Sequence, residues 1–331
     1  MRLAIDAMGN DRGCTPIVAG VRRFLETDAE TSVILVGREE ALAAELRQNG
    51  LDGNPRLSIR NASQVVEMGD KIDALREKRD SSILKLVELH RTGEADGIVA
   101  LGNTAAAVAA VRLGLRHIKG VHRAGIAVPM PNETGMTVVI DMGANVIPKP
   151  QHLYAYGIMA SDYAEMVLGI KRPRVGLLNV GEEVGKGNEL LQEAYDLLQK
   201  SPVNFIGNVE GRNIFDGSCD VIVCDGFVGN AVLKSAEQMA VAMMNIIKGQ
   251  LMQSWVSRLG ALLCRGAFRR IKRKLSYEET GGAPLLGVDG VCIIGHGRSN
   301  DVAVMNALRV ARESVSCRLN EHIRKTLEAG V

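Results

Sequence analysis

Short apolar runs, each followed by a stretch with helical periodicity, constrain the fold of this chain more than any other feature. Several runs are continuous, such as GIVAL at 97–101, instead of alternating apolar with polar residues. A continuous run is typical of a strand buried on both faces, because a strand with one solvent-exposed face alternates apolar and polar residues. Strands are predicted at 2–6, 32–37, 57–60, 97–101, 137–141, 175–180, 203–207, 220–225 and 291–295. Helices are predicted at 15–26, 39–48, 82–93, 104–115, 151–168, 187–200, 228–248 and 298–327.

This order of elements predicts one α/β domain over residues 1–331. Alternating strands and helices form a parallel or mixed sheet that is covered by helices on both faces, with right-handed crossovers. No repeat of fixed period and no proline-rich linker divides the chain. Only the segment 249–276 interrupts the alternation, and we interpret it as a helical insertion within the domain.

Composition excludes several classes of function. The net charge is +2 and aromatic residues make up 3%, whereas single-strand nucleic-acid binders combine basic grooves with aromatic platforms. The six cysteines include no C-x-x-C pair, so zinc and redox motifs lack support, and a reducing cytoplasm fits. The N-terminus reaches Asp6 too early for a signal peptide. We therefore expect a cytoplasmic protein that does not bind nucleic acid.

Many predicted strands end in a loop that combines glycine with a small polar residue. In open α/β sheets ligands bind beyond the carboxyl ends of the strands, and glycine lets backbone N–H groups approach an anion at a helix start. The loops are DAMGND (6–11), LGNTAA (101–106), DMGAN (141–145), NVGEEVGKGNE (179–189), CDGFVGN (224–230) and GHGRSN (295–300). Each alone is explained as well by a plain turn. Gathered at one end of the sheet, they predict a shared binding site.

Two side chains in these loops suit anion or acid–base chemistry. Lys186 lies between Gly185 and Gly187 just before a predicted helix, where a cation would face an anion bound at the helix start. A solvated loop lysine explains it too. His296, at a strand end, is either an acid–base group or a turn histidine. P-loop, G-x-G-x-x-G and G-x-S-x-G motifs are absent at the corresponding places, and the other histidines show no metal-ligand spacing.

The segment 249–276 is both amphipathic and basic. Its apolar residues repeat at helical spacing, and they are Met252, Trp255, Val256, Leu259, Leu262, Leu263, Phe268, Ile271 and Leu275. Arginines and lysines surround the second half, and no acidic residue occurs between Glu237 and Glu278. This pattern is typical of a helix lying in a membrane interface. A buried dimer or core face with a solvated rim is the alternative.

Taken together, these motifs resemble the phosphate acyltransferase (PlsX) family of bacterial phospholipid synthesis over nearly the whole chain. The resemblance is carried by IDAMG near the start, LREKRDSSI at 75–83, GNT at 102–104, DMGAN with KPQHL at 141–153, GLLNVGEEVGKGNEL at 176–190, GNVEGRNIFDG at 207–217, DVIVCDGFVGNAVLK at 220–234 and GGAPLLGVDGVCIIGHGRSN at 281–300.

The resemblance implies an enzyme that converts acyl-acyl-carrier-protein and orthophosphate into acyl phosphate and free acyl carrier protein. It implies a three-layer α/β/α Rossmann-like sandwich, similar to phosphotransacetylase and to isocitrate and isopropylmalate dehydrogenases. It also implies a homodimer that associates peripherally with membrane lipid. Neither a cofactor nor a metal is implied.

For the site, the resemblance and the loops together assign Lys186 to phosphate or the oxyanion, with Asn230 as its catalytic partner. Asn230 and Asn188 position substrate through amide hydrogen bonds. Asn103 and Thr104 line the phosphate cradle. The remaining candidates, for orientation or proton transfer, are Asp225, Asp6 and His296. In the insertion we expect lipid contact from Trp255, Leu259, Leu262 and Phe268.

Two alternatives remain open at this point. One is an NAD-dependent dehydrogenase of similar fold, which needs a nucleotide loop and metal-binding aspartates. The other is a non-catalytic lipid-binding adaptor on a membrane. The VGKGNE loop at 184–189 argues against the adaptor.

Overall fold

One 11-stranded sheet organises residues 1–275 and 281–329, which are the residues that this computed structural model describes. The strand order is β3-β2-β1-β4-β11-β10-β5-β6-β9-β7-β8. The strands are β1 (Arg2–Asp6), β2 (Ser32–Gly37), β3 (Leu57–Asn61), β4 (Gly97–Gly102), β5 (Gly125–Pro131), β6 (Met136–Ile140), β7 (Arg174–Leu178), β8 (Asn204–Val209), β9 (Val221–Val223), β10 (Ala283–Leu286) and β11 (Cys292–His296).

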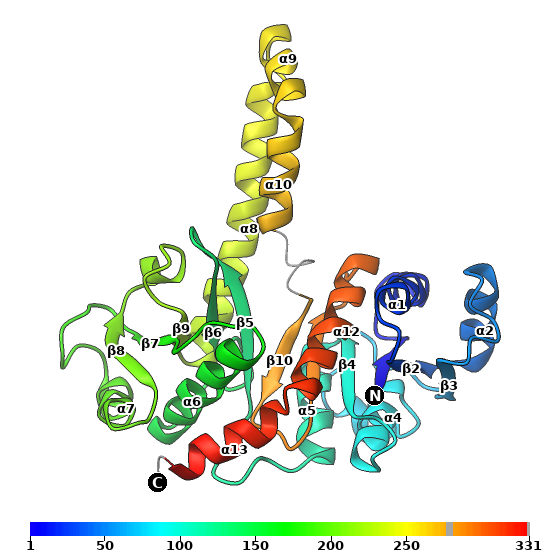
Figure 1. Ribbon diagram of the computed structural model, residues 1–331, viewed down its shortest axis with the longest axis horizontal. Coiled ribbons are helices and arrows are strands. Elements are labelled where there is room, and N and C mark those ends of the chain that lie inside the picture. The colour runs from blue at the N-terminus through cyan, green and yellow to red at the C-terminus, as the bar shows by residue number, and fades with distance from the viewer. Residues whose placement is uncertain (276–280, 330–331) are drawn as a thin grey trace.

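Helices cover both faces of this sheet (Figure 1). One face is covered by α1 (Thr15–Thr27), α2 (Glu39–Gln48), α6 (Pro150–Met166), α7 (Glu189–Gln199), α12 (Asp301–Ser316) and α13 (Leu319–Ala329). The other face is covered by α3 (Ala74–Glu77), α4 (Ser82–Arg91), α5 (Thr104–Gly114) and the first turns of α8 (Gly226–Leu251). The predicted three-layer α/β/α sandwich is confirmed.

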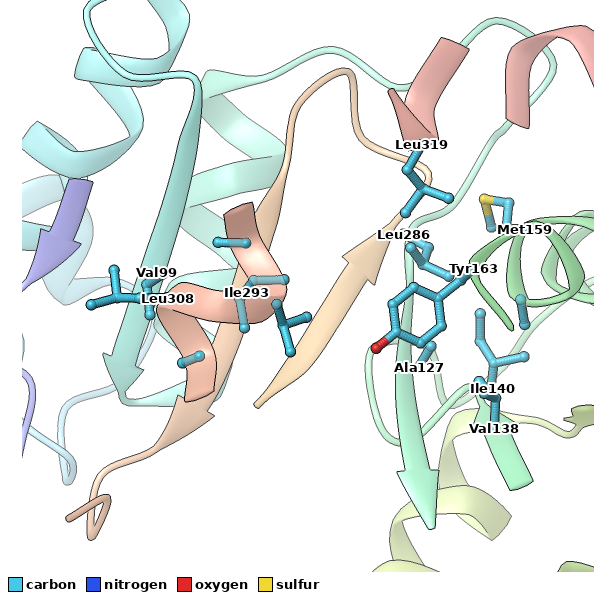
Figure 2. Packing of buried hydrophobic residues seen from close by; sticks show 14 of the residues in the cluster. Val99, Ala127, Val138, Ile140, Met159, Tyr163, Leu286, Ile293, Leu308 and Leu319 are labelled. Atoms are coloured by element: carbon cyan, nitrogen blue, oxygen red, sulfur yellow. The ribbon is translucent and has the colours of Figure 1, made fainter. Parts of the chain in front are cut away.

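The continuous apolar strands supply two separate cores, one on each face. Along β4, Val99 and Leu101 belong to the core under α12, whereas Ile98 and Ala100 belong to the core under α4 and α5. Successive strand residues point to opposite faces, so a strand buried on both sides has no polar position. Figure 2 shows the first core, where Tyr163 and Met159 of α6 pack over β5, β6 and β10.

The sheet changes direction near its centre. β10 is antiparallel to both β11 and β5, and β5 is in turn antiparallel to β6. As a result β1, β4 and β11 run one way, whereas β6, β7 and β9 run the other way. The prediction that all the glycine loops share one end of the sheet is therefore wrong, although residues of four of them, 101–106, 141–145, 224–230 and 295–300, line one cavity. The loops 6–11, 101–106 and 295–300 lie at one edge, and 141–145, 179–189 and 224–230 lie at the opposite edge.

Other differences from the predicted elements have local causes. The predicted helix 298–327 is two helices, because Arg318 adopts a left-handed φ of 53° between α12 and α13. Strand β5 was missed, since Pro129 and Pro131 interrupt its apolar run and proline is normally depleted in strands. Strand β10 is also absent from the predicted strands, and it has only 4 residues.

A helical arm projects from the body. It consists of the distal part of α8, then α9 (Trp255–Leu263) and α10 (Arg265–Leu275), which fold back beside α8 as an antiparallel hairpin (Figure 1). α8 continues through Gly249 to Leu251, so the arm begins before the basic segment 249–276. Among the described residues, no helix combines the length and the hydropathy needed to cross a bilayer.

Candidate active site

A cavity of about 570 Å³ lies between α5 and α8, over the central strands. α5 contributes one helical face, at Thr104, Ala105, Val108, Ala109 and Arg112. α8 contributes another, at Gly226, Phe227, Asn230, Leu233, Lys234 and Glu237. Residues spaced by three and four positions share a side of a helix, so two helices facing each other form the two walls.

One end of the cavity suits an anion. His296 pairs in register with Gly102, which places the end of β11 beside the start of α5. Ser299 and Ala303, at the start of α12, line the same cavity as Thr104 and Ala105 at the start of α5. The starts of two helices therefore border one space, where the helix dipoles favour negative charge. The N–H groups of Ser299 and Ala303 themselves donate to the carbonyl oxygen of His296 and to Oδ1 of Asn300.

Lys234 brings a full positive charge to this anion-binding end. Its Nζ lies 2.9 Å from Oε2 of Glu237, one turn further along α8, and both side chains line the cavity. Burial lowers the pKa of His296 below its ordinary value of 6.5, and the Lys234 ammonium lowers it further. The imidazole is therefore neutral at pH 7, and the charged groups beside it are Lys234 and its partner Glu237.

An NMR titration of the His296 ring tests this electrostatic coupling. We expect a pKa below 6.5 in the wild type and a higher value in Lys234→Met, because removing a nearby cation makes protonation easier. Lys248→Met, an exposed change on the same helix, is the control and leaves the pKa where it was. An unchanged pKa in Lys234→Met would show that the two groups are not coupled.

The floor of the opposite end is a loop held by one buried carboxylate. Asp141 Oδ1 accepts hydrogen bonds from the backbone N–H groups of Ile126, Gly143 and Ala144, at 3.0, 3.1 and 2.9 Å. Oδ2 accepts from the N–H of Asn145 at 2.7 Å. Burial nevertheless raises the pKa of Asp141. These bonds fix the loop 141–145, against which α8 begins.

Asn230 faces this loop from α8. A Cβ placed on Gly143 would lie at ordinary contact distances from Asn230, 3.5 Å from its Cβ and 3.7 Å from its Oδ1, so the amide packs against this loop. Gly143 also has a φ of 129°, which favours glycine. The Asn230 amide thus lies between the anion-binding end and the loop 141–145.

Apolar side chains make up most of the remaining wall, and they suit a hydrocarbon chain. They include Leu101, Val108, Ile126, Val128, Met142, Leu233 and Ile294. A concave, mainly apolar site with a few polar groups at one end is typical of small-molecule binding sites.

The structure brings Thr104, Asn230 and His296 of the predicted site residues together around the cavity. Asn103 does not line it. Its Oδ1 accepts from the N–H of Ala106 at 3.0 Å, and its Nδ2 lies 3.1–3.2 Å from the carbonyl oxygens of Glu67, Met68 and Asp70. Asn103 therefore caps α5 and ties down the loop around 67–70.

Asp6, Asp225 and Asn188 also have structural partners outside the cavity lining. Asp6 is buried, accepts from the N–H of Met8 at 2.9 Å, and has its pKa raised by burial. Asp225 caps α8 by accepting two backbone N–H groups at 2.9 Å. Asn188 caps α7 by accepting from Leu191 at 3.1 Å.

Lys186 lies on the loop after β7, at the other sheet edge from Thr104, and does not line the cavity. Its Nζ is 3.9 Å from Oε1 of Glu183, and its side chain is 53% exposed. The loop itself is ordered, because Asn179 Nδ2 donates to the Lys186 carbonyl at 3.0 Å and Gly185 and Gly187 adopt left-handed φ values of 88° and 86°.

Sequence reasoning missed Lys234, Arg112 and Asp141. Lys234 follows Asn230 by four residues on a predicted helix, a spacing that places both on one side. That signal was available inside the motif DVIVCDGFVGNAVLK at 220–234. Arg112 had no comparable signal, since its helix reads as nearly uniform alanine and valine.

The described part of the chain shows no metal centre, and most of its thiols are wholly or partly buried. Among those residues, no group of three or more histidine, cysteine, aspartate or glutamate side chains is arranged to hold a metal ion. Burial raises the pKa of five cysteine thiols, and they are Cys14, Cys219, Cys224, Cys292 and Cys317. A raised thiol pKa disfavours the nucleophilic thiolate.

Comparison with known proteins places these features in a family. Residues 1–322 match the family model described as fatty acid synthesis protein. A protein from Pelotomaculum thermopropionicum named phosphate acyltransferase is 49% identical over 330 residues, covering 99% of this chain and 96% of that protein. One of the same name from Desulfitobacterium hafniense is 47% identical, covering 99% and 98%.

Solved structures resemble the fold at much lower identity. A phosphotransacetylase from Streptococcus pyogenes has a TM-score of 0.66 at 15% identity, covering 95% of this chain and 94% of that one. A branched-chain phosphotransacylase from Enterococcus faecalis has a TM-score of 0.58 at 14% identity, covering 95% and 99%. These likenesses support the predicted fold class.

Proposed function

This chain belongs to the phosphate acyltransferase family of fatty acid synthesis proteins, and on that premise we propose that it transfers an acyl group from acyl-acyl-carrier-protein to orthophosphate. The products are acyl phosphate and free acyl carrier protein. Family membership makes the chain an acyltransferase, so neither a dehydrogenase nor an adaptor without chemistry is favoured. The carrier-bound substrate and the phosphate acceptor are the proposal.

The observation that carries the proposal is an anion-binding end beside an apolar wall in one cavity. Orthophosphate would bind between the starts of α5 and α12, next to Lys234. The acyl chain would lie along the apolar residues between α5 and α8. This arrangement holds a nucleophile and a thioester together, which converts a bimolecular step into an effectively unimolecular one.

The chemistry needs no nucleophilic side chain. An oxygen of HPO₄²⁻ attacks the thioester carbonyl carbon, the C–S bond breaks, and the phosphate proton leaves with the sulfur as a thiol. Its pKa resembles that of cysteine, about 8.5, so a general acid gives little additional help.

The tetrahedral intermediate carries its negative charge on the former carbonyl oxygen. We assign the Asn230 amide to this oxyanion and Lys234 to the phosphate. Removing one such donor typically costs about 10²–10³ in turnover, because a preorganised dipole needs no rearrangement during the reaction.

Release of free thiol from an acyl carrier thioester tests this function. We expect release that requires added phosphate, saturates with it, and is matched by acyl phosphate that hydroxylamine traps. Thiol release that is independent of phosphate would identify a thioesterase instead. Stimulation by NAD, with no dependence on phosphate, would favour the dehydrogenase alternative.

Lys186 remains a second candidate cation, because the motif that contains it is part of the family resemblance. Lys186→Ala is expected to lower phosphate-dependent turnover at least about ten-fold, or about 1.4 kcal/mol, with the fold intact. Glu183→Gln, which removes the neighbouring carboxylate, is the matched control. Wild-type turnover in Lys186→Ala would remove this residue from the mechanism.

The helical arm supports peripheral membrane association. Trp255, Leu259 and Leu262 follow one another by four and three residues, so they share one face of α9, and they are 77%, 52% and 63% exposed. Basic residues of α10 follow directly. Phe268 differs, because it is half-buried on α10. An exposed apolar face with adjacent cations suits an anionic lipid surface.

Flotation with anionic vesicles tests this part of the proposal. Trp255→Glu is expected to reduce the lipid-bound fraction, since it places a negative charge among the apolar side chains of α9. Cys264 is exposed next to α9, and Cys264→Ser, which adds no charge, is the control. Equal flotation of wild type and Trp255→Glu would show that this face does not bind lipid.

A homodimer also fits the arm. Met239, Met243 and Ile246 are exposed at 63%, 54% and 66%, and their spacing places them on one side of α8. A second copy of the chain would cover this stripe. Light scattering of Met243→Glu, compared with wild type, measures whether the stripe holds two copies together.

A further inference from the structure

A second hollow, a groove of about 290 Å³, lies between α4 and α5 on the far side of α5 from the cavity. Ala110, Gly114 and Val87 are part of it, and a Cβ on Gly114 would collide with Cγ1 of Val87. Glycine at 114 thus lets α5 approach Val87 of α4 closely at the base of the groove. Leu113 lies beside them and is 75% exposed.

The rim of this groove is positively charged. Arg79, Lys85 and Arg91 line it together with one carboxylate, Glu88. Lys85 lies 3.5 Å from Glu88 and 3.7 Å from Asp80, so these charges largely offset one another. Arg79 and Arg91 form no salt bridge with any residue in 1–275 or 281–329. Two guanidinium groups at the rim of a groove that also exposes Leu113 therefore have no acidic partner among the described residues.

α5 separates the groove from the cavity and touches both. Its residues 104, 105, 108, 109 and 112 line the cavity, whereas 110, 113 and 114 line the groove. Thr104 and Arg112 are eight residues apart, or about 12 Å along a helix. The groove thus adjoins the Arg112 end of the cavity, about that distance from the anion-binding end.

We propose that this groove is the docking site of the acidic carrier protein that delivers the acyl thioester. A negatively charged helix would place carboxylates on Arg79 and Arg91 and an apolar residue on Leu113. Its thioester arm would then enter past Arg112. This inference rests on the proposed function and adds the surface on which the protein substrate binds. The occupant is argued from charge complementarity, which governs steering and specificity at such interfaces.

The test compares a groove variant with a matched variant elsewhere. Arg79→Glu/Arg91→Glu is expected to weaken binding of the free carrier protein at least ten-fold, and kcat/KM for its acyl thioester by a similar factor. The same acyl group on free pantetheine should react within two-fold of the wild-type rate, because the cavity is unchanged. Arg47→Glu/Lys325→Glu reverses two exposed cations on α2 and α13 and should leave both substrates unaffected.

The outcomes separate this inference from the proposed function. If the wild type makes acyl phosphate from both substrates and the groove variant binds the carrier normally, the groove is not the docking site. If Arg269→Glu/Arg273→Glu in the arm weakens carrier binding and the groove variant does not, the carrier docks on the arm. If the groove variant loses vesicle flotation but keeps carrier binding, the groove serves lipid. Wild-type protein that makes no acyl phosphate from either substrate contradicts the proposed function itself.

Discussion

Replacing Lys234 by methionine is expected to lower kcat/KM for phosphate at least about 100-fold, which is about 2.7 kcal/mol of transition-state stabilisation. Methionine keeps the length and the apolar stem of lysine but removes its charge. The anion-binding end would then depend on helix N-termini and on a neutral histidine. The Lys234 side chain is 51% exposed, so solvent screens part of its charge, but a dianion beside apolar walls still loses more from a missing cation than it would in bulk water.

The same substitution elsewhere on α8 provides the control. Lys248 is exposed on the arm, so Lys248→Met should leave kcat/KM unchanged. Lys234→Arg, which restores a positive charge with different geometry, should recover part of the loss. Thermal unfolding of each variant checks that the fold persists. If Lys234→Met works within three-fold of wild type, Lys234 does not bind the phosphate, and Lys186 becomes the stronger candidate.

Gly229→Ala is expected to destabilise the protein by about 3 kcal/mol or more and to abolish turnover. A Cβ at this position would collide with the backbone carbonyl oxygen of Asp141 and approach the sulfur of Cys224. That carbonyl has little freedom to move, because four backbone N–H groups hold the Asp141 carboxylate and so fix the loop. Overpacking against side chains costs about 1–3 kcal/mol, and a clash with a fixed backbone atom costs more because that atom cannot move aside. α8 would shift and carry Asn230 and Lys234 with it.

Urea unfolding measures this effect, and the chain offers a matched control. Gly249 lies in the same helix, and a Cβ added there would meet no other atom within 4 Å. Its change to alanine is expected to stabilise the helix by up to about 1 kcal/mol. The two glycine-to-alanine changes on α8 should therefore have opposite signs. A small effect at both positions would mean that α8 is free to move away from the loop 141–145.

Local patterns predicted part of the candidate site. The loops that supply Thr104, Asn230 and His296 were found because glycine with a small polar residue after an apolar run is a local signal. The capping roles of Asn103, Asn188 and Asp225 follow from the same signal, since Asn and Asp at a helix start accept backbone N–H groups. Sequence alone could not separate a cap from a ligand-binding side chain.

The sequence by itself determined the three-layer α/β class, the positions of most strands and helices, the amphipathic segment and the family. These depend on periodicity and motif, which are properties of neighbouring residues. Only the tertiary structure decided which loops meet. The reversal at β10 and β6 sends Lys186 to the opposite sheet edge from Thr104, while α8 crosses the sheet and brings Lys234 to His296. Strand direction and helix packing arise from long-range pairing, so no local pattern in the chain encodes them.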